Sequence, residues 1–234
     1  MTVKQRYVAV CQHIAALNSL HDSSCTPTSL LAVSKGQSVD VISELVDLGQ
    51  VHFGENYVQE AVPKIESLRS CDLDWHFIGR RQSNKLDSIA RHFSWVDSLS
   101  SVKHAEKLNA ARASYGIPIN VCLQVKLSDN DKKSGLTEAE LLPVVREMSK
   151  FPFVRLRGFM TMCAQHDSVS QRRQQYMKLS KLRDQAVGGG VDLDTLSMGM
   201  SDDYELAINA GATVVRVGTG IFGPRYGVVR DGEV

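Results

Sequence analysis

The sequence predicts an α/β fold, a single (β/α)8 TIM barrel formed by one domain over residues 1–234. Short apolar runs alternate with segments of helical periodicity, which is typical of a parallel sheet covered by helices. Eight such units fit into roughly 200 residues, the size of a closed barrel. No proline- or glycine-rich linker divides the chain. A doubly wound open sheet is the alternative.

The amphipathic segment 2–20 predicts an extra N-terminal helix, which we expect to close the bottom of the barrel. Apolar runs, among them the almost unbroken β-branched run at 119–125, predict the strands. These are expected at 30–33, 51–53, 75–78, 95–96, 119–125, 154–159, 195–196 and 213–217. A helix is expected after every strand except the last. These helices are expected at 39–48, up to about 68, and at 84–92, 102–114, 137–150, 168–186 and 202–210.

Composition excludes several classes of protein. There are 27 basic and 26 acidic residues, a net charge of +1, so bulk charge supports neither nucleic-acid nor membrane binding. No run approaches the length of a membrane span. The five cysteines are widely spaced without a C-x-x-C pair, and the histidines show no metal-ligand spacing. We therefore expect a cytoplasmic monomer with reduced thiols, no metal and no nucleic-acid or membrane partner.

Barrel closure makes the first and last strands neighbours and directs attention to the strand ends. Active sites of such barrels lie where strands end, and phosphate is commonly held by the loops after strands 7 and 8. Lys35 follows the first strand. A lysine there either extends to solvent or, if partly buried, has the lowered pKa of an amine that attacks aldehydes.

The loops after strands 7 and 8 are candidate anion sites. Ser201 is expected to be an N-cap, and its hydroxyl and the helix N–H groups are suited to phosphate if Asp202 and Asp203 point away. The run Gly218–Gly223 matches G-x-G-x-x-G but comes too late in the chain for a dinucleotide fold. It indicates either backbone N–H groups that approach an anion or a simple turn. The glycines at 188–190 precede strand 7 and indicate a helix end.

A phosphorylated aldehyde is a ligand that suits all three strand ends. The lysine would take the carbonyl, and the last two loops would take the phosphate, with Arg216 alongside. Pyridoxal 5′-phosphate (PLP) is the commonest such molecule, and a Schiff-base aldolase for sugar phosphates has the same needs. His76, inside the third strand, is expected to be a satisfied core histidine.

Several ordered motifs resemble the YggS/PROSC family of pyridoxal phosphate homeostasis (pyridoxal phosphate-binding) proteins over nearly the whole chain. They stand at 31–35, 53–60, 76–79, 82–85, 133–135, 157–160, 196–202 and 215–219. The resemblance implies a barrel like the N-terminal domain of alanine racemase. It further implies PLP as cofactor, held by Lys35 as a Schiff base (an internal aldimine), with the phosphate on Ser201, Gly218 and Thr219. Met200 would supply backbone beside the phosphate.

The resemblance also assigns the ring of the cofactor. Arg216 would face the pyridine nitrogen, and Asn56 and Met160 would line the ring. Departures from the family occur at Arg80-Arg81, which add charge at the mouth, and at Met162-Cys163. We expect both to lie clear of the cofactor contacts.

These residues predict binding without catalytic turnover. Arginine can only donate a hydrogen bond, so a pyridine nitrogen facing Arg216 stays unprotonated and the ring is a weak electron sink. We also expect no counterpart of the second domain of alanine racemase, because few residues follow the last predicted strand. The predicted function is vitamin B6 (PLP) homeostasis, with PLP-dependent apoenzymes as possible recipients of the cofactor and no catalytic residue. A PLP-dependent amino-acid racemase is the alternative, and a Schiff-base aldolase is a third.

Overall fold

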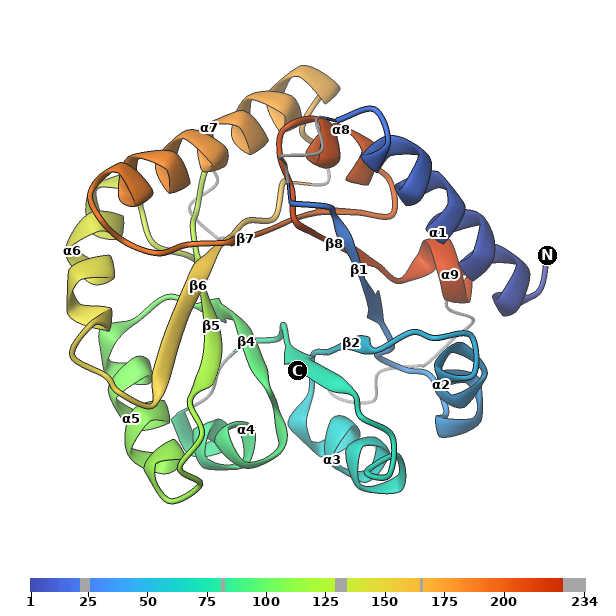
Figure 1. Cartoon of the computed structure of the whole chain (residues 1–234), viewed down its shortest axis with the longest axis horizontal. Helices are drawn as coiled ribbons and strands as arrows, with labels where there is room; N and C mark the ends of the chain where they lie inside the picture. The colour runs from blue at the N-terminus through green and yellow to red at the C-terminus, as the bar shows by residue number, and fades with distance from the viewer. Residues whose placement is uncertain (22–25, 81–82, 129–133, 165, 225–234) are drawn as a thin grey trace, which may run out of the picture.

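The computed structural model describes residues 1–21, 26–80, 83–128, 134–164 and 166–224. Its strands form a closed parallel barrel in sequence order, and the helices surround it (Figure 1). The closed barrel confirms the predicted fold class and removes the open-sheet alternative. The strands are β1 Ser29–Val33, β2 His52–Glu55, β3 Asp74–Phe77, β4 Trp95–Leu99, β5 Ile119–Gln124, β6 Val154–Met160, β7 Thr195–Met200 and β8 Val214–Val217.

The helices follow the strands as the periodicity predicts. In the outer ring they are α2 Val39–Val46, α3 Val58–Ser67, α4 Leu86–His92, α5 Val102–Ala113, α6 Glu138–Met148, α7 Val169–Gly188 and α8 Tyr204–Asn209, with α1 Val3–Asn18 before them and α9 Thr219–Phe222 at the end. Helix α7 ends in the glycines 188–190, as expected, and Gly190 has a positive φ of 89°.

Pairing of β1 with β8 closes the barrel. Leu31 lies opposite Arg216 and Ala32 opposite Val217, although about 180 residues separate the two strands. The side chains on the barrel wall are almost completely excluded from solvent, including Leu31, Phe53, Val121 and Phe159, all 0% exposed. Closure therefore places the end of β1, which Lys35 follows, directly beside the end of β8, which Gly218 follows.

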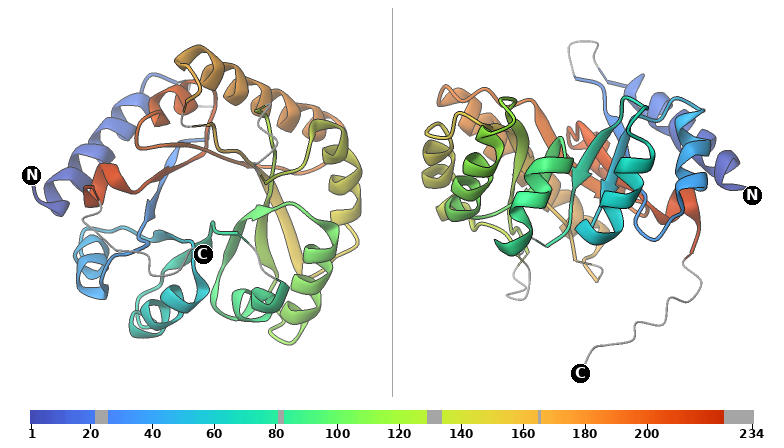
Figure 2. Two further views of the ribbon diagram at one scale, coloured as in Figure 1. Left: turned by 180° about the vertical axis from the view of Figure 1, so that it is seen from behind. Right: turned by 90° about the horizontal axis from the view of Figure 1, so that it is seen from below.

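Helix α1 does not close the bottom of the barrel as expected. It runs along the outside, in the ring between α8 and α2 and beside α9 (Figures 1 and 2). One face is buried through Tyr7, Val10, Ile14 and Leu17, a stripe with helical spacing. Because α8 is short, α1 covers wall that a longer helix would cover. Arg6 Nε donates to the carbonyl oxygen of Ile221 at 2.6 Å, which ties α1 to α9.

Two helix ends differ from the sequence prediction. Helix α8 begins at Tyr204 rather than at 202, with Asp203 as its N-cap residue. Ser201 is therefore not a helix cap. A short helix, α9, follows the last strand, where none was expected. No helix in the described part of the chain is long and apolar enough to cross a membrane.

Candidate functional site

The eight residues predicted to bind the cofactor line one cavity at the mouth where the strands end. The cavity measures about 390 Å³. Residues from strands far apart in sequence meet there because the barrel is closed. The predicted lining residues are Lys35, Asn56, Met160, Met200, Ser201, Arg216, Gly218 and Thr219, and Val33, Ile78 and Gly79 join them.

Lys35 is half-buried in a turn that a buried ion-pair cluster holds in place. Lys64 Nζ donates to the carbonyl oxygen of Ser34 at 3.0 Å, and to carboxylate oxygens of Glu55 at 2.8 Å and Glu60 at 2.5 Å. Ser34 Oγ also donates to Glu55 at 2.7 Å, and the Gly36 N–H donates to Glu60 at 2.5 Å. These hydrogen bonds thus hold the backbone on both sides of Lys35.

This cluster was not found from the sequence. Glu55 is fully buried, and burial raises its carboxyl pKa even though Lys64 and Ser34 favour the ionised form. Lys64 stands in helix α3 and is 6% exposed. The one signal available was the charged pair Glu60 and Lys64 at a spacing of four residues, which usually marks a solvated helix face.

The loop after β7 presents Ser201 to the end of β8. The Gly220 N–H donates to Ser201 Oγ at 3.1 Å. Asp203 is 4% exposed and turned away, since it accepts from the Met200 N–H at 2.7 Å and pairs with Arg172 at 3.4 Å. Asp203 therefore points away from the cavity, as a phosphate site at Ser201 requires. Asp202, in contrast, is exposed and lines the cavity.

Gly218 closes the cradle against the first strand. A Cβ atom on Gly218 would lie 3.4 Å from Val33, and one on Gly220 would lie 2.9 Å from Val217. The Gly220 N–H is already used by Ser201 Oγ, and of the three glycines of the run only Gly218 lines the cavity, beside Ser201 and Thr219. Gly218 therefore belongs to the cavity wall, whereas Gly220 and Gly223 belong to the short helix after β8 and its end.

Arg216 is 4% exposed and its guanidinium is fixed on two sides. Nη1 donates to Ser197 Oγ at 2.8 Å, and Nη2 donates to the carbonyl oxygen of Thr161 at 2.8 Å. Burial lowers the pKa of Arg216, and the nearby carboxylate of Asp97 opposes this shift. An arginine remains charged under such conditions, so Arg216 offers fixed N–H donors at the floor of the cavity.

The charge of Arg216 is balanced through a chain of buried hydrogen bonds. Ser197 Oγ donates to Asp97 Oδ2 at 3.0 Å, and Asp97 Oδ1 lies 2.9 Å from Nδ1 of His76. Burial alone would raise the pKa of Asp97, but His76, Arg216 and Ser197 outweigh it, and the pKa falls below its usual value. His76 is buried as expected, yet its Nε2 atom has no hydrogen-bond partner, so it is not a fully satisfied core histidine.

Asn56 and Gly79 bring the second and third strand ends together. A Cβ atom on Gly79 would lie 1.9 Å from the carbonyl oxygen of Asn56, so only glycine allows this approach. The Oδ1 atom of Asn56 is buried without a protein partner. It is an acceptor available to a molecule in the cavity.

One residue from each departure from the family lies at the cavity. Arg80 and Met162 both line it, and the expectation that they lie clear of the cofactor contacts stays a prediction. Arg80 also lines an adjoining hollow of about 510 Å³, together with Asn56, Tyr57 and Lys85. Arg81 lies outside the described residues, as do Cys25, Lys132 and Lys133. None of the described cysteines, Cys11, Cys71, Cys122 and Cys163, forms a disulfide.

Fold and site define a class: a (β/α)8 barrel in which a lysine and a group of small residues line one cavity at the mouth where the strands end. Residues 9–226 match the family model described as alanine racemase, N-terminal domain. The chain belongs to this family and, within it, to the group of pyridoxal phosphate homeostasis proteins.

Two relatives and one more distant structure illustrate the membership. The pyridoxal phosphate homeostasis protein of Pasteurella multocida is 40% identical over 229 residues, covering 96% of this chain and 98% of that protein. The structure of PipY from Synechococcus elongatus with PLP bound is 34% identical, with a TM-score of 0.83, and covers 95% of this chain and all of that one. Alanine racemase of Clostridium difficile, at 16% identity and a TM-score of 0.68, shares the fold over 92% of this chain and 56% of its own.

Proposed function

We propose that this chain binds PLP in the cavity at the barrel mouth and maintains the cellular supply of the cofactor without catalysing turnover. The observation that carries the proposal is that one cavity of about 390 Å³ is lined by Lys35, by a small-residue cradle and by Arg216. Its volume is in the range of small-molecule sites. The PLP-bound structure of PipY supports the same ligand.

The residues present fit the group. PLP supplies an aldehyde that condenses with a primary amine, and Lys35 provides the amine beside β8. Ser201, Gly218 and Thr219 would hold the phosphate, with Met200 beside them. The unpartnered Oδ1 atom of Asn56 and the side chain of Met160 would contact the ring.

Arg216 would donate to the pyridine nitrogen and keep it unprotonated. Ser197 and Thr161 fix its two Nη atoms, so the direction of the remaining N–H groups is set before the ligand arrives. A ring held in this way withdraws electrons weakly. Within the described cavity lining, the titratable side chains are Lys35, Arg80, Asp202 and Arg216. The set holds no histidine, tyrosine or cysteine, and Asp202, an exposed residue, is its one carboxylate.

The proposal extends to the setting in which the protein works. We propose a cytoplasmic monomer that passes PLP to apoenzymes through the exposed mouth. Met162 and Met200 are 39% and 38% exposed there, and the charged residues Arg80 and Lys85 lie at the adjoining hollow. An exposed rim of this kind leaves the ligand accessible.

Three assays on one purified sample separate the candidate functions. Titration with PLP should give a saturable absorbance band. A protein that does not bind PLP would instead fit the third candidate, a Schiff-base aldolase for sugar phosphates. Incubation with L-alanine or D-alanine should leave each enantiomer unchanged, whereas steady racemisation would establish the enzyme alternative. Loaded protein should reactivate a PLP-dependent apoenzyme while free PLP is scavenged, and failure would remove the delivery role.

A further inference from the structure

The hollow that adjoins the proposed PLP cavity is large enough to be a site of its own. It measures about 510 Å³, in the range of small-molecule sites. Its described lining residues are Asn56, Tyr57, Val58, Gln59, Phe77, Arg80 and Lys85. Asn56 and Arg80 also line the PLP cavity, whereas the other five do not. The hollow is therefore a neighbouring space and not a part of the PLP cavity.

Residues from two successive strand ends meet at this hollow. The segment after β2 leads into the first turn of α3, and β3 ends at Phe77. Lys85 comes from a short 3-10 helix, η1 Ser83–Lys85. A Cβ atom at Gly79 would lie 1.9 Å from the carbonyl oxygen of Asn56, so glycine at this position lets the two segments approach each other. The fold thus brings Arg80 and Lys85 to the start of α3.

The charges in the hollow favour an anion. Arg80 and Lys85 are cations, and the described lining includes no aspartate or glutamate. Within the part of the chain that the structure describes, neither cation forms an ion pair. The acidic residue in the first turn of α3 is Glu60, whose carboxylate accepts from Lys64 and from the Gly36 N–H. Glu60 is therefore engaged by other partners and does not balance the two cations.

The rest of the lining combines apolar surface with the positive end of a helix. The aromatic side chain of Tyr57 is 52% exposed, and the apolar side chains of Phe77 and Val58 are almost fully buried. Tyr57 is also the N-cap residue of α3, and its side chain makes no capping hydrogen bond. The first N–H groups of a helix carry partial positive charge, which adds to that of the two cations. A ligand suited to this lining has both an anionic group and a flat apolar part.

We propose that this hollow binds a small organic phosphate monoester with a flat ring, in addition to the ligand of the PLP cavity. Arg80 and Lys85 bind the phosphate, and Tyr57 contacts the ring. A phosphate monoester carries a charge of about −1.5 to −2 at neutral pH, which matches two cations, whereas a monocarboxylate balances only one. Arginine also presents paired N–H groups that suit phosphate oxygens.

The test compares three probes that share a phenyl ring and differ in charge. Cofactor-free protein at pH 8 and constant ionic strength is titrated with phenyl phosphate, benzoate or benzylammonium. NMR follows the ring signals of Tyr57, which the Tyr57→Phe variant identifies. Phenyl phosphate should shift these signals saturably, benzoate should bind about tenfold more weakly, and benzylammonium should not bind. No shift with phenyl phosphate, or binding of either other probe as tightly as phenyl phosphate, would overturn the proposal.

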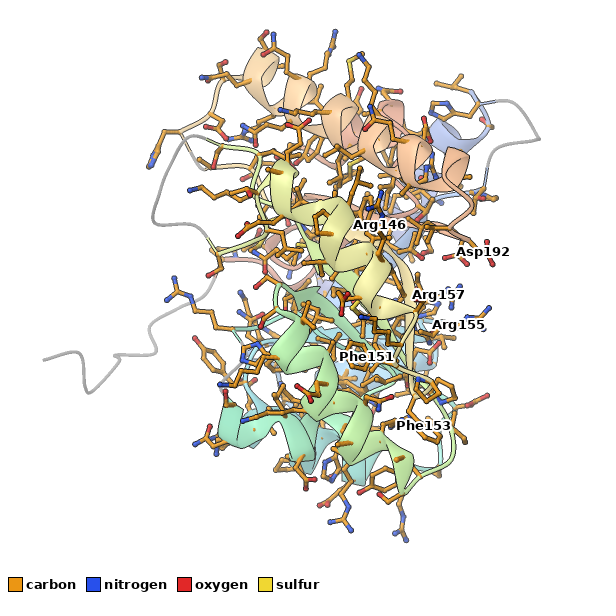
Figure 3. The ribbon with its side chains drawn as sticks, turned by 90° about the vertical axis from the view of Figure 1, so that its left-hand side faces the viewer. Arg146, Phe151, Phe153, Arg155, Arg157 and Asp192 are labelled. Carbon is orange, nitrogen blue, oxygen red and sulfur yellow. The ribbon has the colours of Figure 1, made fainter. Side chains whose placement is uncertain are left out.

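Variants with matched controls assign the two cations. Lys85→Met and Arg80→Met should each weaken binding of phenyl phosphate about tenfold, because each removes one charged partner of the phosphate. The controls are Lys181→Met, at an exposed lysine on α7, and Arg155→Met, at an exposed arginine on β6 (Figure 3). Both should leave the Kd unchanged, and Lys85→Arg, which keeps the charge, should retain binding. Equal Kd values for Lys85→Met and Lys181→Met would contradict the proposal.

One more variant separates this hollow from the PLP cavity. Ser201 lines the PLP cavity but not the hollow, so Ser201→Ala should leave the titration at Tyr57 unchanged. Loss of the Tyr57 shift in a folded Ser201→Ala protein would place phenyl phosphate in the PLP cavity and overturn the proposal. The readout needs no PLP. A protein that binds phenyl phosphate at Tyr57 and fails to bind PLP would therefore contradict the proposed function and support this second site.

Discussion

Arg216 combines two features that rarely occur together: a charge that is almost fully buried and a direction fixed from two sides. Its guanidinium is bound by Ser197 and Thr161, and its charge faces Asp97. We therefore propose that the residue orients a donor toward the ring of the ligand. The phosphate would be held elsewhere, at Ser201, Gly218 and Thr219.

This division of roles predicts the outcome of Arg216→Ala. The absorbance of bound PLP should change clearly, while the Kd for PLP should change less than about tenfold, or about 1.4 kcal/mol. Absorbance titration measures both quantities on one sample. Loss of PLP binding together with loss of binding of inorganic phosphate would show that Arg216 holds the phosphate instead.

At the scale of elements, the turn after β1 depends on helix α3. Lys64 reaches from α3 to Ser34, Glu55 and Glu60, and so fixes the backbone on both sides of Lys35. Lys64 and Glu55 have side chains that are 7% and 0% exposed. Removing one member of such a buried pair leaves an uncompensated charge.

Lys64→Met should accordingly destabilise the protein by about 3 kcal/mol and weaken PLP binding, although Lys64 does not line the cavity. Urea unfolding and PLP titration measure the two effects. Lys85→Met, at a lysine in the adjoining hollow, is the matched control and should change stability little. Equal effects of the two substitutions would mean that the cluster does not support the turn.

At the scale of the whole molecule, the sequence predicted the features that repeat or that stand at strand ends. Alternating apolar runs predicted the barrel, and closure then placed Lys35 beside Gly218. The structure brings together all eight residues that the strand ends and the family resemblance had selected. Their roles stay predictions until a ligand is bound.

Features that depend on contacts between distant side chains escaped prediction. Helix α8 starts late because Asp203 binds the Met200 N–H, and Ser201 is free of a capping role for the same reason. Lys64 binds Ser34 after β1 and Glu55 on β2, and His76 on β3 binds Asp97 on β4, so these contacts join different elements of the fold. Helix α1 lies along the outside of the barrel, where its apolar stripe is buried. Helical periodicity predicts the stripe but does not say which surface it will pack against.

Stability should depend on pH through His52. Its pKa is lowered by burial, so the folded protein binds a proton less readily than the unfolded chain, whose imidazole has a pKa of about 6.5. The free energy of unfolding should therefore fall as the pH drops from 7 toward 5. The raised pKa of Glu55 acts in the opposite direction at the lower end of this range.

A substitution separates the two contributions. In His52→Gln the part of the slope due to His52 disappears, so the variant should lose less stability than the wild type between pH 7 and pH 5. Urea unfolding at three pH values checks this expectation. Parallel curves for the two proteins would show that His52 titrates in the folded state as it does in the unfolded chain.

The central claim is that the amine of Lys35 meets a phosphorylated aldehyde held by the loops after β7 and β8. The most direct test is to load the protein with PLP, reduce it with borohydride, digest it and locate the pyridoxyl group by mass spectrometry. The account predicts the label on Lys35, its absence from a folded Lys35→Ala variant, and its retention in Lys85→Ala. A label on another lysine of the wild-type protein, or no label at all, would contradict the account.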